Sequence, residues 1–123
     1  MSTASHDYRR KQIRPVWCPG CGNYGVLRGV ENALKRLEVQ MQQTVVVSGI
    51  GCAGRFSHYL DTYSLHGTHG RALPIATGVK TARPDLTVLV VGGDGDSLGI
   101  GGGHLPHAAR KNVDLTFLIL DNN

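Results

Sequence analysis

Two uninterrupted apolar runs constrain the fold of this 123-residue chain more than any other feature of its sequence. Residues 86–91 and 115–120 are rich in leucine, valine and isoleucine, as strands buried on both faces of a sheet are. Gly-Asp-Gly at 93–95 follows the first run, and Asn122 follows the second. The sequence therefore predicts an α/β protein with a doubly wound, mostly parallel sheet, whose strand ends bind a ligand.

The residues at these two strand ends suit a divalent cation that holds a diphosphate. Asp94 offers a carboxylate, Asn122 offers a side-chain carbonyl, and Gly93 and Gly95 let backbone amides approach phosphate oxygens. Magnesium fits, because it takes few protein oxygens and completes its octahedron with phosphate and water. Each segment alone is also ordinary turn chemistry. The intervening loop, helix and strand form a single βαβ step, which strengthens the prediction of a site.

The remaining hydrophobic pattern alternates between helices and strands, without internal repeats. Apolar residues at helical spacing predict an amphipathic helix over about residues 24–39 and a second helix that ends before Pro84. Residues 44–48 are predicted to form a strand, and residues 49–71 are interpreted as irregular. Length and composition fit one domain at most.

Four motifs, in this order, give the chain a family resemblance. They read WCPGCGNYG at 17–25, SGIGCAGR at 48–55, THGRALPIATGVK at 68–80 and GGDGDSLGIGGGHLPHAARKNVD at 92–114. With the GDG and NN signature of thiamine diphosphate enzymes, they resemble the β subunit of 2-oxoacid:ferredoxin oxidoreductases, especially the 2-oxoglutarate branch. The resemblance implies that residues 1–123 are an N-terminal fragment of a single, truncated thiamine diphosphate-binding domain, with 1–15 as a flexible or partner-facing arm.

The resemblance also implies an activity. The expected reaction is the oxidative decarboxylation of a 2-oxoacid, such as 2-oxoglutarate or pyruvate, to an acyl-coenzyme A. Thiamine diphosphate and Mg²⁺ are the implied cofactors, and a 4Fe–4S cluster passes the electrons to ferredoxin. An α subunit is the implied partner and supplies the acid that activates the aminopyrimidine, so the isolated chain is expected to be inactive.

The same resemblance assigns functions to individual residues. His69 is the expected catalytic residue, although a glycine-flanked histidine is otherwise typical of a turn. Mg²⁺ is expected on Asp94 and Asn122, with a further protein ligand beyond residue 123. The cluster is expected on Cys18, Cys21 and Cys52, with a fourth cysteine also beyond the chain end. The expected cofactor-binding residues are Ile50, Gly51, Cys52, Ala53, His69, Gly93, Gly95 and Asp96.

The cysteines and glycines, taken without the resemblance, allow other sites. The CxxC pair at 18–21 could form a thioredoxin-like redox pair, although no strand precedes it, or a structural zinc site with Cys52 and a histidine. Gly49, Gly51 and Gly54 match the GxGxxG fingerprint of dinucleotide-binding domains, but the expected acidic residue does not follow. A non-catalytic fragment that only binds a cofactor or partner is the remaining alternative.

Composition excludes some classes of function. The net charge is +4, with a basic cluster at residues 9–14, but no aromatic interleaving or binding motif indicates nucleic acid. That cluster could instead steer an acidic ferredoxin. No apolar run is long enough to cross a bilayer, and residues 1–10 lack a hydrophobic secretory core. The expected location is therefore cytoplasmic.

Overall fold

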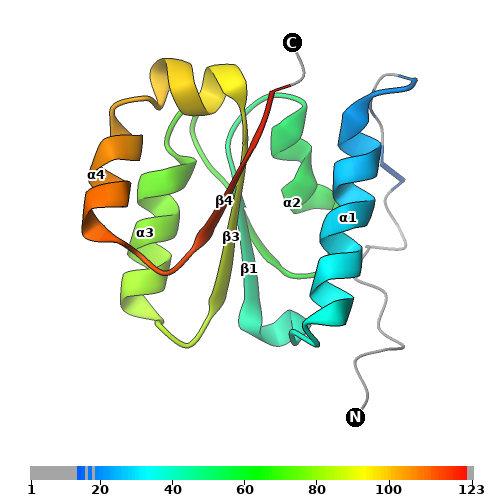
Figure 1. Ribbon diagram of the computed structural model, residues 1–123, viewed down its shortest axis with the longest axis horizontal. Helices are drawn as coiled ribbons and strands as arrows, with labels where there is room; N and C mark the ends of the chain where they lie inside the picture. The colour runs from blue at the N-terminus through cyan, green and yellow to red at the C-terminus, as the bar shows by residue number, and fades with distance from the viewer. Residues whose placement is uncertain (1–13, 16, 18, 122–123) are drawn as a thin grey trace.

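One parallel sheet organises the chain (Figure 1). The computed structural model describes residues 14–15, 17 and 19–121. Within these residues the strand order is β2-β1-β3-β4, and every neighbouring pair is parallel. The strands are β1 (Thr44–Ser48), β2 (Tyr63–His66), β3 (Thr87–Gly93) and β4 (Thr116–Leu120). The predicted α/β class and parallel sheet are confirmed.

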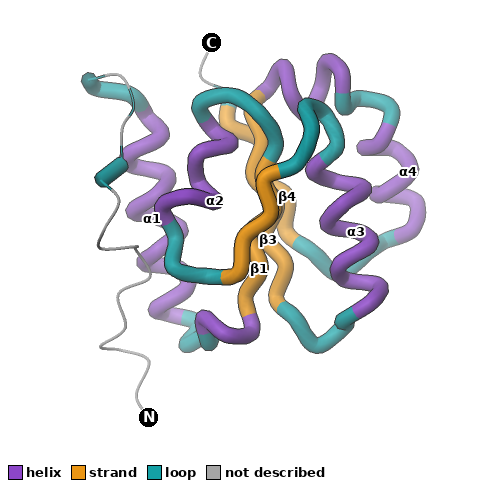
Figure 2. The backbone as a smooth tube through the Cα atoms, turned by 180° about the vertical axis from the view of Figure 1, so that it is seen from behind, coloured by secondary structure: helices purple, strands orange, loops and turns teal. Residues whose placement is uncertain are grey.

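Helices cover both faces of this sheet. Helices α1 and α2 lie on one side, and α3 and α4 lie on the other, as the two opposite views show (Figures 1 and 2). The arrangement is therefore doubly wound, as predicted. The α-helices are α1 (Gly22–Arg36), α2 (Phe56–Tyr59), α3 (Ala72–Ala82) and α4 (His104–Lys111), and the shorter helical turns are η2 (Met41–Gln43), η3 (Ala53–Arg55) and η4 (Gly95–Ile100). None of the described helices is long and apolar enough to span a membrane.

The two central strands, β1 and β3, are buried on both faces, and their alternate side chains pack into two separate hydrophobic cores. All five residues of β1 are buried, as are the residues of β3 from Val88 to Gly92. On the α1 side, Val46, Leu89 and Val91 pack with residues such as Leu27 and Phe56. On the α3 side, Val45, Val47, Val88 and Val90 pack with Ala72, Leu73 and Ala76. These cores explain why the central runs have no polar alternation.

The prediction of an irregular segment at 49–71 was wrong, because this segment contains α2 and β2. Strand β2 pairs only with β1 among the described strands, so it is an edge strand. Tyr63 and Leu65 are 64% and 42% exposed. A short strand that is this exposed needs no apolar run, and it therefore leaves only a weak signal in the sequence.

The last strand and the first helix also differ in detail from the prediction. The middle residues of β4 are only half-buried, because β3 is its one described neighbour. Helix α1 starts at Gly22, earlier than predicted, because Cys21 acts as its N-cap and its Sγ atom accepts a hydrogen bond from the Asn23 N–H. Strands β1, β3 and β4 lie at or within two residues of their predicted bounds.

An exposed ion pair lies in the turn before β3, at the end of the sheet where the parallel strands begin. The Arg83 guanidinium donates to the Asp85 carboxylate at 2.8 Å, and this hydrogen bond lowers the pKa of Asp85 and raises that of Arg83. Both side chains are largely exposed to solvent, so the pair contributes little to stability.

Two glycines provide a matched test of this packing. A Cβ atom at Gly54 would collide with the backbone oxygen of Gly49, whereas a Cβ at Gly78, inside α3, would meet no heavy atom within 4 Å. We expect Gly54→Ala to lower the free energy of unfolding by about 1–3 kcal/mol. Gly78→Ala should leave it unchanged or raise it by up to about 1 kcal/mol, through helix propensity. Urea unfolding measures both, and equal effects would contradict the described approach of Gly54 to Gly49.

Candidate functional site

The strand order creates a crevice at the carboxyl ends of β1 and β3. These strands are neighbours, yet the chain leaves β1 toward β2 on one side and leaves β3 toward β4 on the other. Open α/β sheets bind ligands where the order reverses in this way. The Gly49 N–H still donates to the Val91 carbonyl at 3.4 Å, so the two departing loops begin side by side. This crevice is the candidate functional site.

The buried carboxylate of Asp96 joins three loops at the crevice. Its side chain is 4% exposed. Its Oδ1 atom accepts hydrogen bonds from the Gly70 N–H at 2.7 Å and from the Ile50 N–H at 3.3 Å. The Nδ1 atom of His69 lies 2.8 Å from the same oxygen. The structure therefore brings together Ile50, His69 and Asp96, three of the residues that the sequence singled out.

Two glycines make room for this carboxylate. A Cβ atom at Gly49 would overlap the Oδ2 atom of Asp96, and a Cβ at Gly92 would lie 3.1 Å from it. The first position accepts no side chain unless the carboxylate moves. Gly49 and Gly92, at the ends of β1 and β3, thus allow the Asp96 carboxylate to approach the backbone. The sequence analysis did not predict this role for the two glycines.

The GDG turn faces open space. A Cβ atom at Gly93 or Gly95 would meet no heavy atom within 4 Å. Asp94 is half-buried and directly precedes η4, and its side chain has no hydrogen bond or ion pair with any described residue. Asp94 and Asp96 therefore differ, because only Asp96 is bound internally. The assignment of Mg²⁺ to Asp94 stays a prediction, and Asn122 lies outside the described residues.

Trp17, which precedes the first cysteine motif in the sequence, lies at the same end of the molecule. The Trp17 indole N–H donates to the Cys52 carbonyl at 2.6 Å. The Trp17 backbone N–H donates to the Tyr24 hydroxyl at 2.7 Å, and that hydroxyl donates to the Trp17 carbonyl at 2.8 Å. The start of α1, where Cys21 lies, is at the sheet end where the strands finish (Figure 1). Trp17 and the start of α1 therefore lie next to residues 49–55.

The cysteines themselves are only partly described. Cys21 is half-buried, Cys52 is exposed, and neither forms a disulfide with a described residue. Cys18 lies outside the described residues. Within the described part of the chain, no three histidine, cysteine or acidic residues come close enough to hold a metal ion. The cluster assignment, which needs Cys18, is therefore untested by this geometry.

The other expected cofactor residues after β1 differ in exposure. Ile50 is exposed, Gly51 has a φ of +104° that favours glycine, and Ala53 is buried at the start of η3.

The dinucleotide alternative fits this loop poorly. Its fingerprint requires a substantial helix and then an acidic residue at the next strand end, whereas α2 has four residues and β2 ends at His66.

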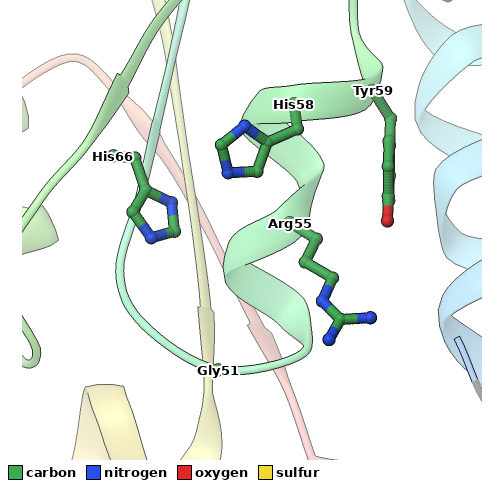
Figure 3. Close-up of a pocket in the computed structure, with 5 residues that line it drawn as sticks. All are labelled: Gly51, Arg55, His58, Tyr59 and His66. Carbon is green, nitrogen blue, oxygen red and sulfur yellow. The ribbon is translucent and has the colours of Figure 1, made fainter. Parts of the chain in front are cut away.

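Sequence reasoning missed a pocket beside the Cys52 loop. It has a volume of about 480 Å³ and is lined by Gly51, Arg55, His58, Tyr59 and His66. The imidazole rings of His58 and His66 lie next to each other, with their centroids 5.0 Å apart, and Arg55 extends from the preceding turn (Figure 3). The recurrence of basic residues between 55 and 66 was its one signal in the sequence.

Comparison with known families identifies the class of this domain. Residues 49–123 match the family described as "Thiamine pyrophosphate enzyme, C-terminal TPP binding domain". Thiamine pyrophosphate is another name for thiamine diphosphate. The chain belongs to this family, and the matched region includes the Cys52 loop, His69, the GDG turn and Asp96.

Individual relatives show which kind of thiamine diphosphate enzyme the chain is similar to. The chain is 49% identical over 116 residues to the β subunit of 2-oxoacid:ferredoxin oxidoreductase 2 from Aeropyrum pernix, covering 94% of this chain and 37% of that protein. It is 51% identical over 118 residues to the 2-oxoglutarate synthase subunit KorB of Archaeoglobus fulgidus, covering 95% and 44%. Its relatives are thus β subunits of 2-oxoacid:ferredoxin oxidoreductases, as the motifs predicted. The chain spans less than half the length of either.

A solved structure has the same fold. It is the 2-oxoglutarate:ferredoxin oxidoreductase from Magnetococcus marinus with 2-oxoglutarate, coenzyme A and succinyl-CoA bound. The TM-score is 0.92 at 47% sequence identity, over 98% of this chain and 40% of that chain. The similarity confirms that the described sheet has the fold of the corresponding part of that chain.

The contact between Trp17 and Cys52 can be tested by a single substitution. Trp17→Phe keeps a large aromatic ring in the core but removes the indole donor, so the Cys52 carbonyl loses a hydrogen bond worth about 0.5–1.5 kcal/mol. We expect hydrogen exchange in residues 49–55 to become faster. Tyr63→Phe, at an exposed position on β2, is the control and should leave exchange there unchanged. Equal exchange in Trp17→Phe and the unsubstituted protein would show that the indole does not hold this loop.

Proposed function

We propose that this chain is the thiamine diphosphate- and Mg²⁺-binding subunit of a 2-oxoacid:ferredoxin oxidoreductase. The proposed reaction converts a 2-oxoacid, with 2-oxoglutarate favoured, to an acyl-coenzyme A and passes electrons through a 4Fe–4S cluster to ferredoxin. The observation that carries the proposal is the convergence of His69 and the Cys52 loop on the carboxylate of Asp96, which directly follows the GDG turn in the sequence. The relatives named above support the reaction and an α-subunit partner. The cytoplasm is the proposed location.

The GDG turn fits the diphosphate and its metal ion. Asp94 has a carboxylate without an internal partner among the described residues, which suits it to bind a cation. Open space in front of Gly93 and Gly95 allows phosphate oxygens to approach the backbone amides. Asn122 is the proposed second metal ligand. Asp96 contributes through its backbone, because its carboxylate is bound internally.

The residues around the crevice have distinct proposed tasks. Thiamine diphosphate, when bound here, would supply the nucleophilic carbon for addition to the keto group of the substrate. Ile50 presents an exposed apolar side chain beside the crevice, where it can exclude water. His69 is half-exposed and can hold or move a proton at its Nε2 atom, because Nδ1 contacts Asp96. His69 is the proposed catalytic residue.

The cluster is proposed to lie between the two neighbouring cysteine segments. Cys18, Cys21 and Cys52 are its proposed ligands. Trp17 precedes Cys18 in the sequence, and its indole N–H donates to the carbonyl of Cys52, so this side chain holds residue 17 against the Cys52 loop. Cys52 belongs to the same loop as Ile50 and Gly51. One short loop would therefore contact both cofactors, which suits electron transfer from one to the other.

The basic pocket is the proposed site for the substrate's negative charge. A 2-oxoacid has one carboxylate, and 2-oxoglutarate has a second at its far end. Arg55, His58 and His66 line a pocket that opens beside Gly51, next to the proposed cofactor loop. A guanidinium pairs well with a carboxylate. This chemistry favours an acidic 2-oxoacid over pyruvate, whose far end is a methyl group.

The metal assignment predicts a specific loss of cofactor binding. Asp94→Asn in the full-length complex removes the one charged metal ligand proposed here. Losing a charged partner of this kind costs about 2–5 kcal/mol, or roughly 30-fold or more in affinity. Calorimetry with thiamine diphosphate and Mg²⁺ measures this change. Asp114→Asn, at a fully exposed carboxylate, is the control and should bind normally. Unchanged affinity in Asp94→Asn would reject Asp94 as the ligand.

The cluster assignment predicts a different pattern. Cys18→Ser, Cys21→Ser and Cys52→Ser should each lose the visible absorbance of the cluster and the reduction of ferredoxin, because a missing thiolate leaves the iron incompletely held. Affinity for thiamine diphosphate should be retained in Cys18→Ser and Cys21→Ser, which lie outside the proposed cofactor loop. Any of these variants that keeps full iron content and ferredoxin reduction would exclude that cysteine.

A further inference from the structure

One carboxylate oxygen holds together three segments that are distant in sequence. The Oδ1 atom of Asp96 accepts from Ile50 in the loop after β1 and from Gly70 in the loop after β2. It also contacts the Nδ1 atom of His69 at 2.8 Å. Asp96 itself lies in η4, after β3. All three loops that border the crevice therefore meet at one buried atom.

We propose that Asp96 is a positioning residue, which acts by fixing the ring of His69 and the loop of Ile50 rather than by contacting substrate. This inference rests on the proposed function, in which His69 is the catalytic residue. It assigns the two acidic residues of the GDGD sequence to different tasks. Asp94 faces outward to the metal ion, and Asp96 faces inward to the loops.

The close contact with Asp96 determines how His69 is presented. The Nδ1 atom lies 2.8 Å from a carboxylate oxygen, which carries lone pairs and no proton, so the neutral ring is favoured with its proton on Nδ1. The Nε2 atom is then the unprotonated nitrogen, available to substrate. The histidine side chain is 46% exposed, and without this contact it would sample several rotamers. The contact selects one orientation and one tautomer before substrate binds.

Burial of the Asp96 carboxylate restricts it to this position beside His69. A carboxylate that is 4% exposed must keep its hydrogen-bond donors, because an unpaired buried charge is costly. Gly49 and Gly92 closely surround the Oδ2 side of the group, and a Cβ atom at Gly49 would overlap it. The carboxylate therefore has little freedom to move away from His69. The position of His69 follows from the packing of the sheet ends rather than from its own exposed loop.

The first experiment separates positioning from direct participation. Asp96→Asn, His69→Gln and the double variant are assayed in the full-length complex with its α subunit. Asparagine keeps an oxygen for the two backbone donors but loses the charge that holds the imidazole. We expect kcat to fall about 10-fold to 100-fold in Asp96→Asn and roughly 100-fold or more in His69→Gln, with KM for the 2-oxoacid little changed. The double variant should be no slower than His69→Gln, within about twofold.

The second experiment needs no catalytic activity. Gly49→Ala forces the Asp96 carboxylate out of place, whereas Gly99→Ala, in the same η4 turn as Asp96, adds a Cβ that meets no heavy atom within 4 Å. Hydrogen exchange is followed by mass spectrometry in residues 67–71, which are distant from Gly49 in sequence. We expect faster exchange there in Gly49→Ala and unchanged exchange in Gly99→Ala.

The outcomes distinguish the two proposals. If the kcat losses of Asp96→Asn and His69→Gln multiply in the double variant, Asp96 does not act through His69 and the inference is overturned. Unchanged exchange of residues 67–71 in Gly49→Ala would overturn the joining of the loops. If the unsubstituted complex reduces no ferredoxin with any 2-oxoacid, the proposed function fails, and the exchange experiment still decides whether Asp96 joins the loops.

Discussion

The parallel pairing of β1 and β3 is the constraint on which the rest of the structure depends. Five residue pairs, from Thr44 opposite Thr87 to Ser48 opposite Val91, bring these two buried strands into register. Each strand can bury both faces only if helices cover both sides, and the chain therefore winds away from the pair in opposite directions. The crevice between the departing loops is a consequence of this winding. A site at this position requires no special feature beyond the side chains that the loops carry.

Among those side chains, Asp96 stabilises the glycine-rich loops at the end of the sheet. The loops that leave β1 and β3 are rich in glycine, and such segments have many accessible conformations and a high entropic cost of ordering. Asp96 offsets that cost by accepting hydrogen bonds from two backbone amides and by a 2.8 Å contact with the His69 imidazole. The absence of side chains at Gly49 and Gly92 is what lets the carboxylate approach. The glycine-rich loops can therefore adopt one fixed conformation, because the buried carboxylate of Asp96 orders them.

The sequence predicted the central part of this arrangement and missed its periphery. Residues 44–48, 86–91 and 115–120 were recognised because strands covered by helices must be apolar on both faces. Strand β2 and the pocket of His58 and His66 were not, because an exposed edge strand and a basic surface leave no periodic signal. The motifs identified the family, and they placed Asp96 among the cofactor residues. They could not show that its carboxylate turns inward, since that depends on contacts with residues 46 and 26 positions away in the sequence.

The loop from Gly49 to Cys52 is held from both ends by different parts of the chain. Asp96 binds the Ile50 N–H from the side of the GDG turn, and the Trp17 indole binds the Cys52 carbonyl from the side of the first cysteine motif. Only Gly51 lies between them, and its φ of +104° fixes a backbone conformation that other residues rarely adopt. A displacement at either anchor must therefore pass to the other within two residues. In the proposed enzyme, this short bridge would connect Ile50 and Gly51, which would bind thiamine diphosphate, with Cys52, which would bind the cluster.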